Sequence, residues 1–80
     1  MKDEQLFLET DFTKIDVMLI KQLLINNGWI IIVTNNTVTI YESQDSFDWE
    51  DVMCERNMGS EQSSLLECFI EIQKYYRRTK

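Results

Sequence analysis

Residues 28–42 read Gly-Trp-Ile-Ile-Ile-Val-Thr-Asn-Asn-Thr-Val-Thr-Ile-Tyr-Glu, and this stretch decides the fold. Two runs rich in β-branched and aromatic residues flank Asn35-Asn36, a pattern that predicts a β-hairpin. Because Asn tolerates positive φ, we expect a two-residue type I′ turn. That turn defines the register of the two strands. It predicts a core-facing side made of Trp29, Ile31, Val33, Val38 and Ile40, with Val33 opposite Val38 and Ile31 opposite Ile40.

The opposite face of the hairpin is also apolar in part, since it carries Ile30, Ile32 and Tyr41. A lone two-stranded hairpin is marginal in water, so the flanking segments must cover it. If helices cover one face alone, these three side chains form an exposed apolar strip, and such a strip marks a partner surface. Self-association through this strip, which would give a homodimer, is one functional hypothesis.

A helix is predicted before the hairpin, over residues 11–27. Either Asp11 or Thr13 is expected to cap its start, and Gly28 is placed to end it in a left-handed conformation. The short link to the hairpin folds this helix back onto the sheet. Its core contacts with the hairpin are expected to come from Leu19 and Leu23.

Two further helices are predicted after the hairpin. The first covers residues 45–58, with Phe47, Val52 and either Trp49 or Met53 on its buried side, and Gly59 ends it. Ser60 then caps the second, which runs to about Arg77. Its apolar residues recur at helical spacing and form the core-facing stripe Leu65, Phe69, Ile72 and Tyr76.

The chain is therefore predicted to be one small α+β domain over residues 1–80, in the order α–β–β–α–α. Residues 1–10 are expected to form an arm or an extra edge strand. No apolar run is long enough to span a membrane, and no secretory signal is recognised, so we expect no membrane contact and a cytoplasmic location.

Catalytic and metal-binding patterns are missing from the sequence. The chain has no His, which is the commonest general base and metal ligand, and no Gly-rich phosphate loop. Cys54 and Cys68 are the two cysteines, and we expect both to be reduced, partly buried thiols. The sequence thus predicts a protein that is not an enzyme and that uses no metal or cofactor.

Charge gives the clearest functional indication. The net charge is −6, and residues 42–55 hold six acids and no base. Such a field repels phosphates and attracts basic surfaces. In its small size and acidity the chain resembles phage or mobile-element inhibitors of host nucleic-acid-binding defence proteins, such as anti-CRISPR proteins of the DNA-mimic type. The predicted partner-binding residues are Glu42, Asp45, Asp48, Trp49, Glu50, Asp51 and Glu55.

The C-terminal segment has the opposite charge, since residues 74–80 carry four basic side chains and no acid. It is expected to be the basic end of the last helix, where cations are favourable against the helix dipole. A weak contact with nucleic acid is the third functional hypothesis. Aromatic and basic side chains together favour such a contact, and they are Tyr75, Arg77, Arg78 and Lys80.

Overall fold

A computed structural model of the chain describes residues 2–79 and has the predicted α+β fold. Within these residues the order of elements is α–α–β–β–α–β–α, with the bounds α1 Lys2–Glu9, α2 Val17–Asn26, β1 Ile30–Val33, β2 Thr37–Tyr41, α3 Gln44–Asp48, β3 Cys54–Asn57 and α4 Glu61–Arg78. No helix in this part of the chain is both long and apolar enough to cross a membrane.

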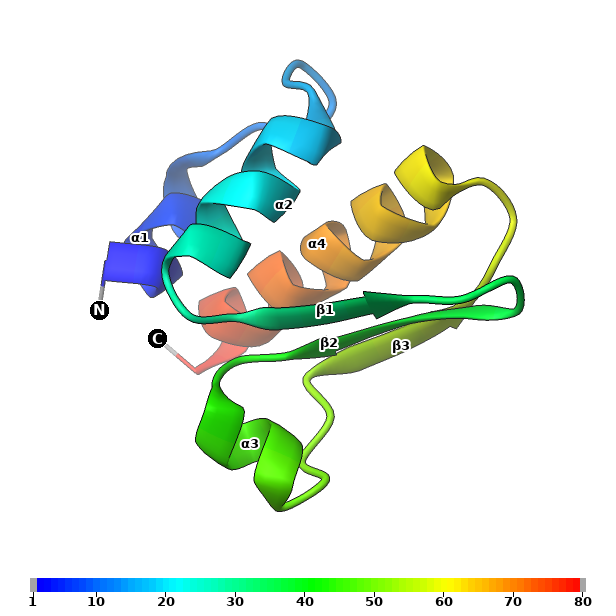
Figure 1. The fold of residues 1–80 in the computed structure, drawn as a ribbon. Coiled ribbons are helices and arrows are strands. Elements are labelled where there is room, and N and C mark those ends of the chain that lie inside the picture. Colours follow the sequence, from blue (N-terminus) through cyan, green and yellow to red (C-terminus); the bar gives the residue numbers. More distant parts are fainter. Residues whose placement is uncertain (1, 80) are drawn as a thin grey trace.

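The three strands form an antiparallel sheet in the order β1-β2-β3. The hairpin register is confirmed, because Val33 pairs with Val38 and Ile31 pairs with Ile40. Helices α1, α2 and α4 lie on one side of the sheet, and α3 projects on the other side (Figure 1). The core therefore lies between α1, α2 and α4 and one face of the sheet.

The turn of the hairpin differs from the predicted type I′ geometry. Among the described non-glycine residues, Glu50 is the one with positive φ, so neither Asn35 nor Asn36 adopts the left-handed conformation. The Thr34 hydroxyl instead accepts hydrogen bonds from the backbone N–H groups of Asn36 and Thr37, at 3.2 and 3.0 Å. This side chain holds the turn and removes the need for positive φ.

The core is centred on aromatic rings. Phe7 is fully buried, and its ring centroid lies 5.4 Å from that of Trp29 and 6.0 Å from that of Phe69. Val38 and Ile40 are buried on the inner face of the sheet, while Ile31 and Val33 are half-buried there. The predicted stripe of α4 is confirmed, since its four members are all buried, namely Leu65, Phe69, Ile72 and Tyr76.

The prediction for residues 1–10 was wrong, because residues 2–9 form helix α1 rather than an arm or edge strand. Asp3 lies in its first turn, where the helix dipole favours a carboxylate. The same carboxylate accepts hydrogen bonds from Trp29 Nε1 at 2.9 Å and from Asn27 Nδ2 at 3.1 Å. These bonds attach α1 to the start of the hairpin, so the helix is stabilised by tertiary contacts and not by its own length.

The helix before the hairpin starts later than predicted. Its N-cap is Asp16, whose side chain accepts a hydrogen bond from the N–H of Met18, and neither Asp11 nor Thr13 caps it. The predicted core contacts of Leu19 and Leu23 were also wrong, since these side chains are 59% and 48% exposed. The end at Gly28 is confirmed by its φ of +98°. The buried face of α2 consists of Val17, Ile20 and Leu24.

The predicted helix over residues 45–58 was wrong in its second half. Helix α3 ends at Asp48, and residues 54–57 form β3, which pairs with β2 so that Ile40 lies opposite Cys54. Phe47 and Val52 were expected to be buried, but they are 38% and 41% exposed, and Trp49, an alternative on the same side, is 83% exposed. Gly59 therefore follows a strand, and Ser60 caps α4 as predicted by accepting a hydrogen bond from the N–H of Ser63.

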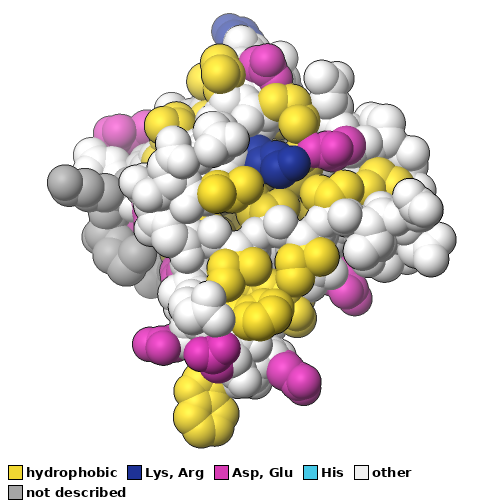
Figure 2. All heavy atoms as spheres, viewed as in Figure 1, with side chains coloured by type: hydrophobic (Ala, Val, Ile, Leu, Met, Phe, Trp, Pro, Cys, Tyr) yellow, Lys and Arg dark blue, Asp and Glu magenta, His cyan; other side chains and the backbone are white. Residues whose placement is uncertain are grey.

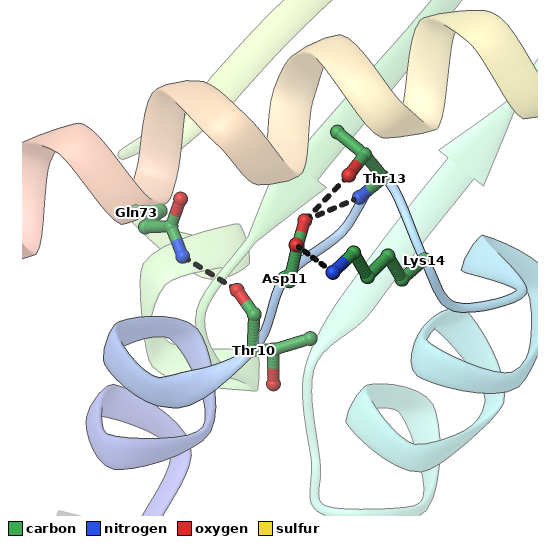
Figure 3. A network of polar contacts seen from close by, with 5 residues as sticks. All are labelled: Thr10, Asp11, Thr13, Lys14 and Gln73. Carbon is green, nitrogen blue, oxygen red and sulfur yellow. Dashed lines mark hydrogen bonds and ion pairs between the residues drawn. The ribbon is translucent and has the colours of Figure 1, made fainter.

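A buried amide joins α4 to the end of α1. Gln73 Nε2 donates hydrogen bonds to the carbonyl oxygens of Phe7 and Thr10, at 2.6 and 2.8 Å. Figure 3 shows Gln73 reaching Thr10 beside Asp11, which accepts hydrogen bonds from the N–H and the hydroxyl of Thr13. These two bonds from Thr13 lower the pKa of Asp11. The polar network thus fixes the link between α1 and α2.

We expect Gln73→Leu to lower the free energy of unfolding by about 1–3 kcal/mol, because two carbonyl groups at the end of α1 would lose their donor. Urea unfolding followed by circular dichroism measures this loss. The control is Gln62→Leu, an exposed position on the same helix, where a change within about 0.5 kcal/mol is expected. Equal effects of the two substitutions would show that Gln73 does not anchor α1.

Candidate functional site

The segment between β2 and β3 carries most of the predicted partner-binding residues. Helix α3 begins after Ser43, whose side chain accepts a hydrogen bond from the N–H of Ser46. The ring of Phe47 packs edge-on against that of Tyr41, with 5.1 Å between centroids. Because Tyr41 belongs to the outer face of the hairpin, this contact fixes α3 on the side of the sheet away from the other helices (Figure 1).

The C-terminal end of α3 has the hydrogen bonds of a Schellman motif. The N–H of Asp51 donates to the carbonyl of Ser46 at 2.8 Å, and that of Glu50 donates to the carbonyl of Phe47 at 3.1 Å. Glu50 therefore takes the left-handed position, with φ of 55°, which glycine usually fills. No glycine marks this helix end in the sequence, so sequence reasoning could not locate it. The motif sets the backbone direction at Trp49, the C-cap residue.

We call Asp45, Asp48, Trp49, Glu50 and Asp51 the acidic tip. Trp49 is 83% exposed, more than any other large hydrophobic side chain among the described residues. The four carboxylates of the tip are all exposed, and none forms an ion pair with a described residue. Figure 2 shows acidic side chains around a projecting hydrophobic one at the α3 end of the molecule. The tip thus combines an exposed aromatic ring with uncompensated negative charge.

The other two predicted partner-binding acids lie apart from the tip. Glu42 accepts a hydrogen bond from the Tyr76 hydroxyl at 2.8 Å. Burial, together with this bond to Glu42, raises the pKa of Tyr76 well above its usual range, so the phenol stays protonated and keeps donating. Glu55 accepts a hydrogen bond from the Thr39 hydroxyl at 2.8 Å. Both carboxylates are therefore tied to α4 or to the sheet, whereas Asp48 of the tip accepts its hydrogen bond from Gln44 Nε2 within α3, at 2.9 Å.

A pocket of about 310 Å³ separates the tip from the C-terminal half of α4. It brings together residues from two predicted sites, because Asp51 and Glu42 line it alongside Tyr75 and Arg78. Both signs of charge thus occur in its lining, and Glu71 adds a third acid. The complete lining is Glu42, Ser46, Asp51, Val52, Met53, Glu71, Ile72, Tyr75 and Arg78.

The residues predicted for nucleic-acid contact and for self-association lie at the end of α4 and on the outer face of the hairpin. Arg77 and Arg78 are exposed in the last turn of α4, Tyr75 is 47% exposed, and Lys80 lies outside the described residues. On the outer face of the hairpin Ile30 and Tyr41 are half-buried, and Ile32 is 37% exposed. The packing of Phe47 against Tyr41 means that α3 covers part of this outer face.

The two cysteines lie where β3 packs against α4, Cys54 on the strand and Cys68 on the helix. Cys54 and Cys68 are both free and buried, as predicted. A hydrogen bond between the thiols lowers the pKa of Cys54 and raises that of Cys68, because the bond stabilises one thiolate and opposes formation of a second. Among residues 2–79 no group of three or more acidic or cysteine side chains is arranged to hold a metal ion.

Comparison of the chain with protein-family models, with curated proteins and with solved structures found no match. The functional argument therefore depends on the residues of this chain. Among its surfaces the acidic tip has the features that call for a functional explanation. It exposes Trp49 and holds Glu50 in an unfavourable backbone conformation, and neither feature contributes to the core.

Proposed function

We propose that this chain is a non-catalytic binding module whose acidic tip docks on a basic surface of another protein. The exposure of Trp49 is the observation that carries the proposal. Full burial of a smaller apolar side chain is worth about 1.5–3 kcal/mol, and a tryptophan that stays 83% exposed forgoes a gain of this order. Tryptophan is also enriched among the residues that dominate binding energy at protein interfaces.

The carboxylates around Trp49 would supply the second part of recognition. Asp48, Glu50 and Asp51 repel one another at this spacing, which costs some stability in the free protein. A basic partner would offset that repulsion. Long-range attraction mainly raises the association rate, whereas a buried aromatic anchor mainly lowers the dissociation rate. The tip therefore has one feature suited to each step of binding.

A nucleic-acid-binding protein is the partner class we infer. Its basic surface is built for a row of phosphates, and the carboxylates of the tip would occupy the places of phosphates. In this version the chain acts as an inhibitor of the DNA-mimic type, similar in action to the anti-CRISPR proteins that it resembles in size and acidity. We also infer a cytoplasmic location, where buried thiols such as Cys54 and Cys68 stay reduced.

An aromatic photo-cross-linking amino acid, p-benzoylphenylalanine, keeps a ring at position 49 and would identify the partner in a lysate of the source cells. The matched control places the same amino acid at Lys74, an exposed position on α4. The proposal expects a basic protein that is captured from position 49 alone. Duplex DNA added in excess should reduce this capture if the partner uses its nucleic-acid-binding surface. If DNA does not affect the capture, the DNA-mimic version is contradicted. The proposal of a binding module would still stand.

Reversing two charges of the tip should weaken binding to the captured partner. We expect Glu50→Lys with Asp51→Lys to raise the dissociation constant by about tenfold at low salt, mainly through a slower association rate. The control reverses Glu9 and Glu67, two exposed acids outside the tip, and so makes the same change in net charge. Biolayer interferometry measures the dissociation constant and the association rate constant of each variant. Equal weakening by the two pairs would mean that net charge, and not the tip, attracts the partner.

A further inference from the structure

Strand β1 forms an open edge of the sheet, because the strand order β1-β2-β3 gives it β2 as its single neighbour. The N–H of Thr34 donates to the carbonyl of Thr37, which makes these two residues a hydrogen-bonded pair. In an antiparallel ladder such pairs alternate with pairs that share no hydrogen bond. Ile31 and Val33 therefore point their backbone N–H and C=O groups away from β2. No other hydrogen bond is found for these groups within residues 2–79.

The two edge strands of the sheet differ in how well their side chains prevent pairing with another chain. The opposite edge, β3, carries Glu55 and Arg56, and charged side chains are a usual defence against pairing with another chain. Strand β1 reads Ile-Ile-Ile-Val and has no charge, no proline and no glycine. Residues 28–41 as a whole carry no charged side chain. An uncharged edge of this kind can pair with a further strand.

We propose that β1 pairs in antiparallel orientation with β1 of a second copy of this chain, which joins the two sheets into one. A second copy fits because the edge is self-complementary about a two-fold axis. With Ile31 of one copy opposite Val33 of the other, each free N–H of one strand meets a free C=O of the other. Two molecules of net charge −6 repel, and the uncharged hairpin is the segment on which they can approach most closely.

The register places Ile32 of one copy opposite Ile32 of the other. This pair shares no hydrogen bond, so the two Cα atoms lie close together and the side chains touch on the outer face of the sheet. Ile32 is 37% exposed in the single chain and would be covered in the dimer. Figure 2 shows hydrophobic side chains gathered over α2 and β1 on the same face of the molecule. Exposed side chains of α2, such as Leu19 and Leu23, would flank the joined edge.

The acidic tip takes no part in this pairing, because it follows β2 and lies beyond the outer face of the sheet. A dimer formed through β1 would leave both tips free. The proposal is therefore independent of the function proposed for the tip.

Sedimentation equilibrium of the full chain, from low to high micromolar concentration, tests the dimer. The wild type should associate reversibly into a dimer. Ile32→Lys should weaken this association by about tenfold or more, because two ammonium groups would then face each other in place of two apolar side chains. Its effect on folding should be small at this partly exposed position, which circular dichroism would verify. The control is Asn57→Lys, the same added charge on the opposite edge strand, and it should leave the dimer intact.

Hydrogen exchange measured by NMR separates edge pairing from other contacts. In the dimer the amide protons of Ile31 and Val33 should exchange more slowly as the protein concentration rises. The amides of Ile30 and Ile32 already face β2 and should change little. A wild type that stays monomeric at high micromolar concentration would overturn the proposal. A dimer without added protection at Ile31 and Val33, or one that Asn57→Lys abolishes, would overturn it as well.

Discussion

Replacing Phe7 by alanine should lower the free energy of unfolding by about 3–5 kcal/mol, the largest loss we expect from any single substitution. Phe7 has no exposed surface, and its ring lies within 6.0 Å, centroid to centroid, of four other aromatic rings. Those rings belong to three parts of the chain, and they are Phe12, Trp29, Phe69 and Tyr76. Removing Phe7 would leave a cavity where α1, α4 and the start of the hairpin meet.

Urea unfolding measures this loss. If the alanine variant is too unstable to fold, Phe7→Leu is a milder substitution that keeps the protein folded. The matched control is Leu19→Ala. Leu19 is 59% exposed on α2, so its truncation should change stability by no more than about 0.5 kcal/mol. A loss below about 1 kcal/mol for Phe7→Ala would show that α1 does not complete the core.

The hairpin and helix α4 were predicted correctly because the sequence pattern of each is compatible with one local structure only. The hairpin has β-branched runs on each side of a two-residue turn, and its register follows from the length of that turn. Helix α4 has apolar residues along one stripe and polar residues elsewhere, so the stripe identifies its buried face. In both cases the local pattern and the tertiary contacts agree.

The errors come from segments whose local pattern is weak or ambiguous. Helix α2 is apolar nearly all round, so spacing alone could not show that Ile20 and Leu24, and not Leu19 and Leu23, face the core. Strand β3 has a single apolar residue, Cys54, and is held by pairing with β2. Helix α1 is short and depends on tertiary hydrogen bonds. Such contacts join residues distant in sequence, which a local pattern does not report.

The sequence predicts which residue types the candidate site contains, but it does not predict how they are arranged in space. The excess of acids in residues 42–55 is visible in the sequence. The separation of Glu42 and Glu55 from the tip is not visible in the sequence, because it depends on their hydrogen bonds with Tyr76 and Thr39. The exposure of Trp49 was also unpredictable, since an aromatic residue near Phe47 is equally compatible with the core. Its position follows from the backbone turn at Glu50.

Trp49→Ala is expected to weaken binding to the partner captured from position 49 by about thirtyfold or more, which corresponds to the loss of about 2 kcal/mol typical of a central aromatic anchor. The same substitution should change the free energy of unfolding by less than about 0.5 kcal/mol, because Trp49 is 83% exposed and has no core contact to lose. Trp49→Phe, which keeps an aromatic ring, should restore part of the affinity.

The kinetics distinguish this effect from that of the charges. Loss of the ring should raise the dissociation rate by a factor that hardly varies with salt, since burial of apolar surface is little screened. Reversal of Glu50 and Asp51 should instead lower the association rate, and its effect should fade between low and physiological ionic strength. If Trp49→Ala leaves the dissociation rate unchanged while the charge reversal still slows association, Trp49 is not an anchor. Recognition of the partner would then depend on the carboxylates alone.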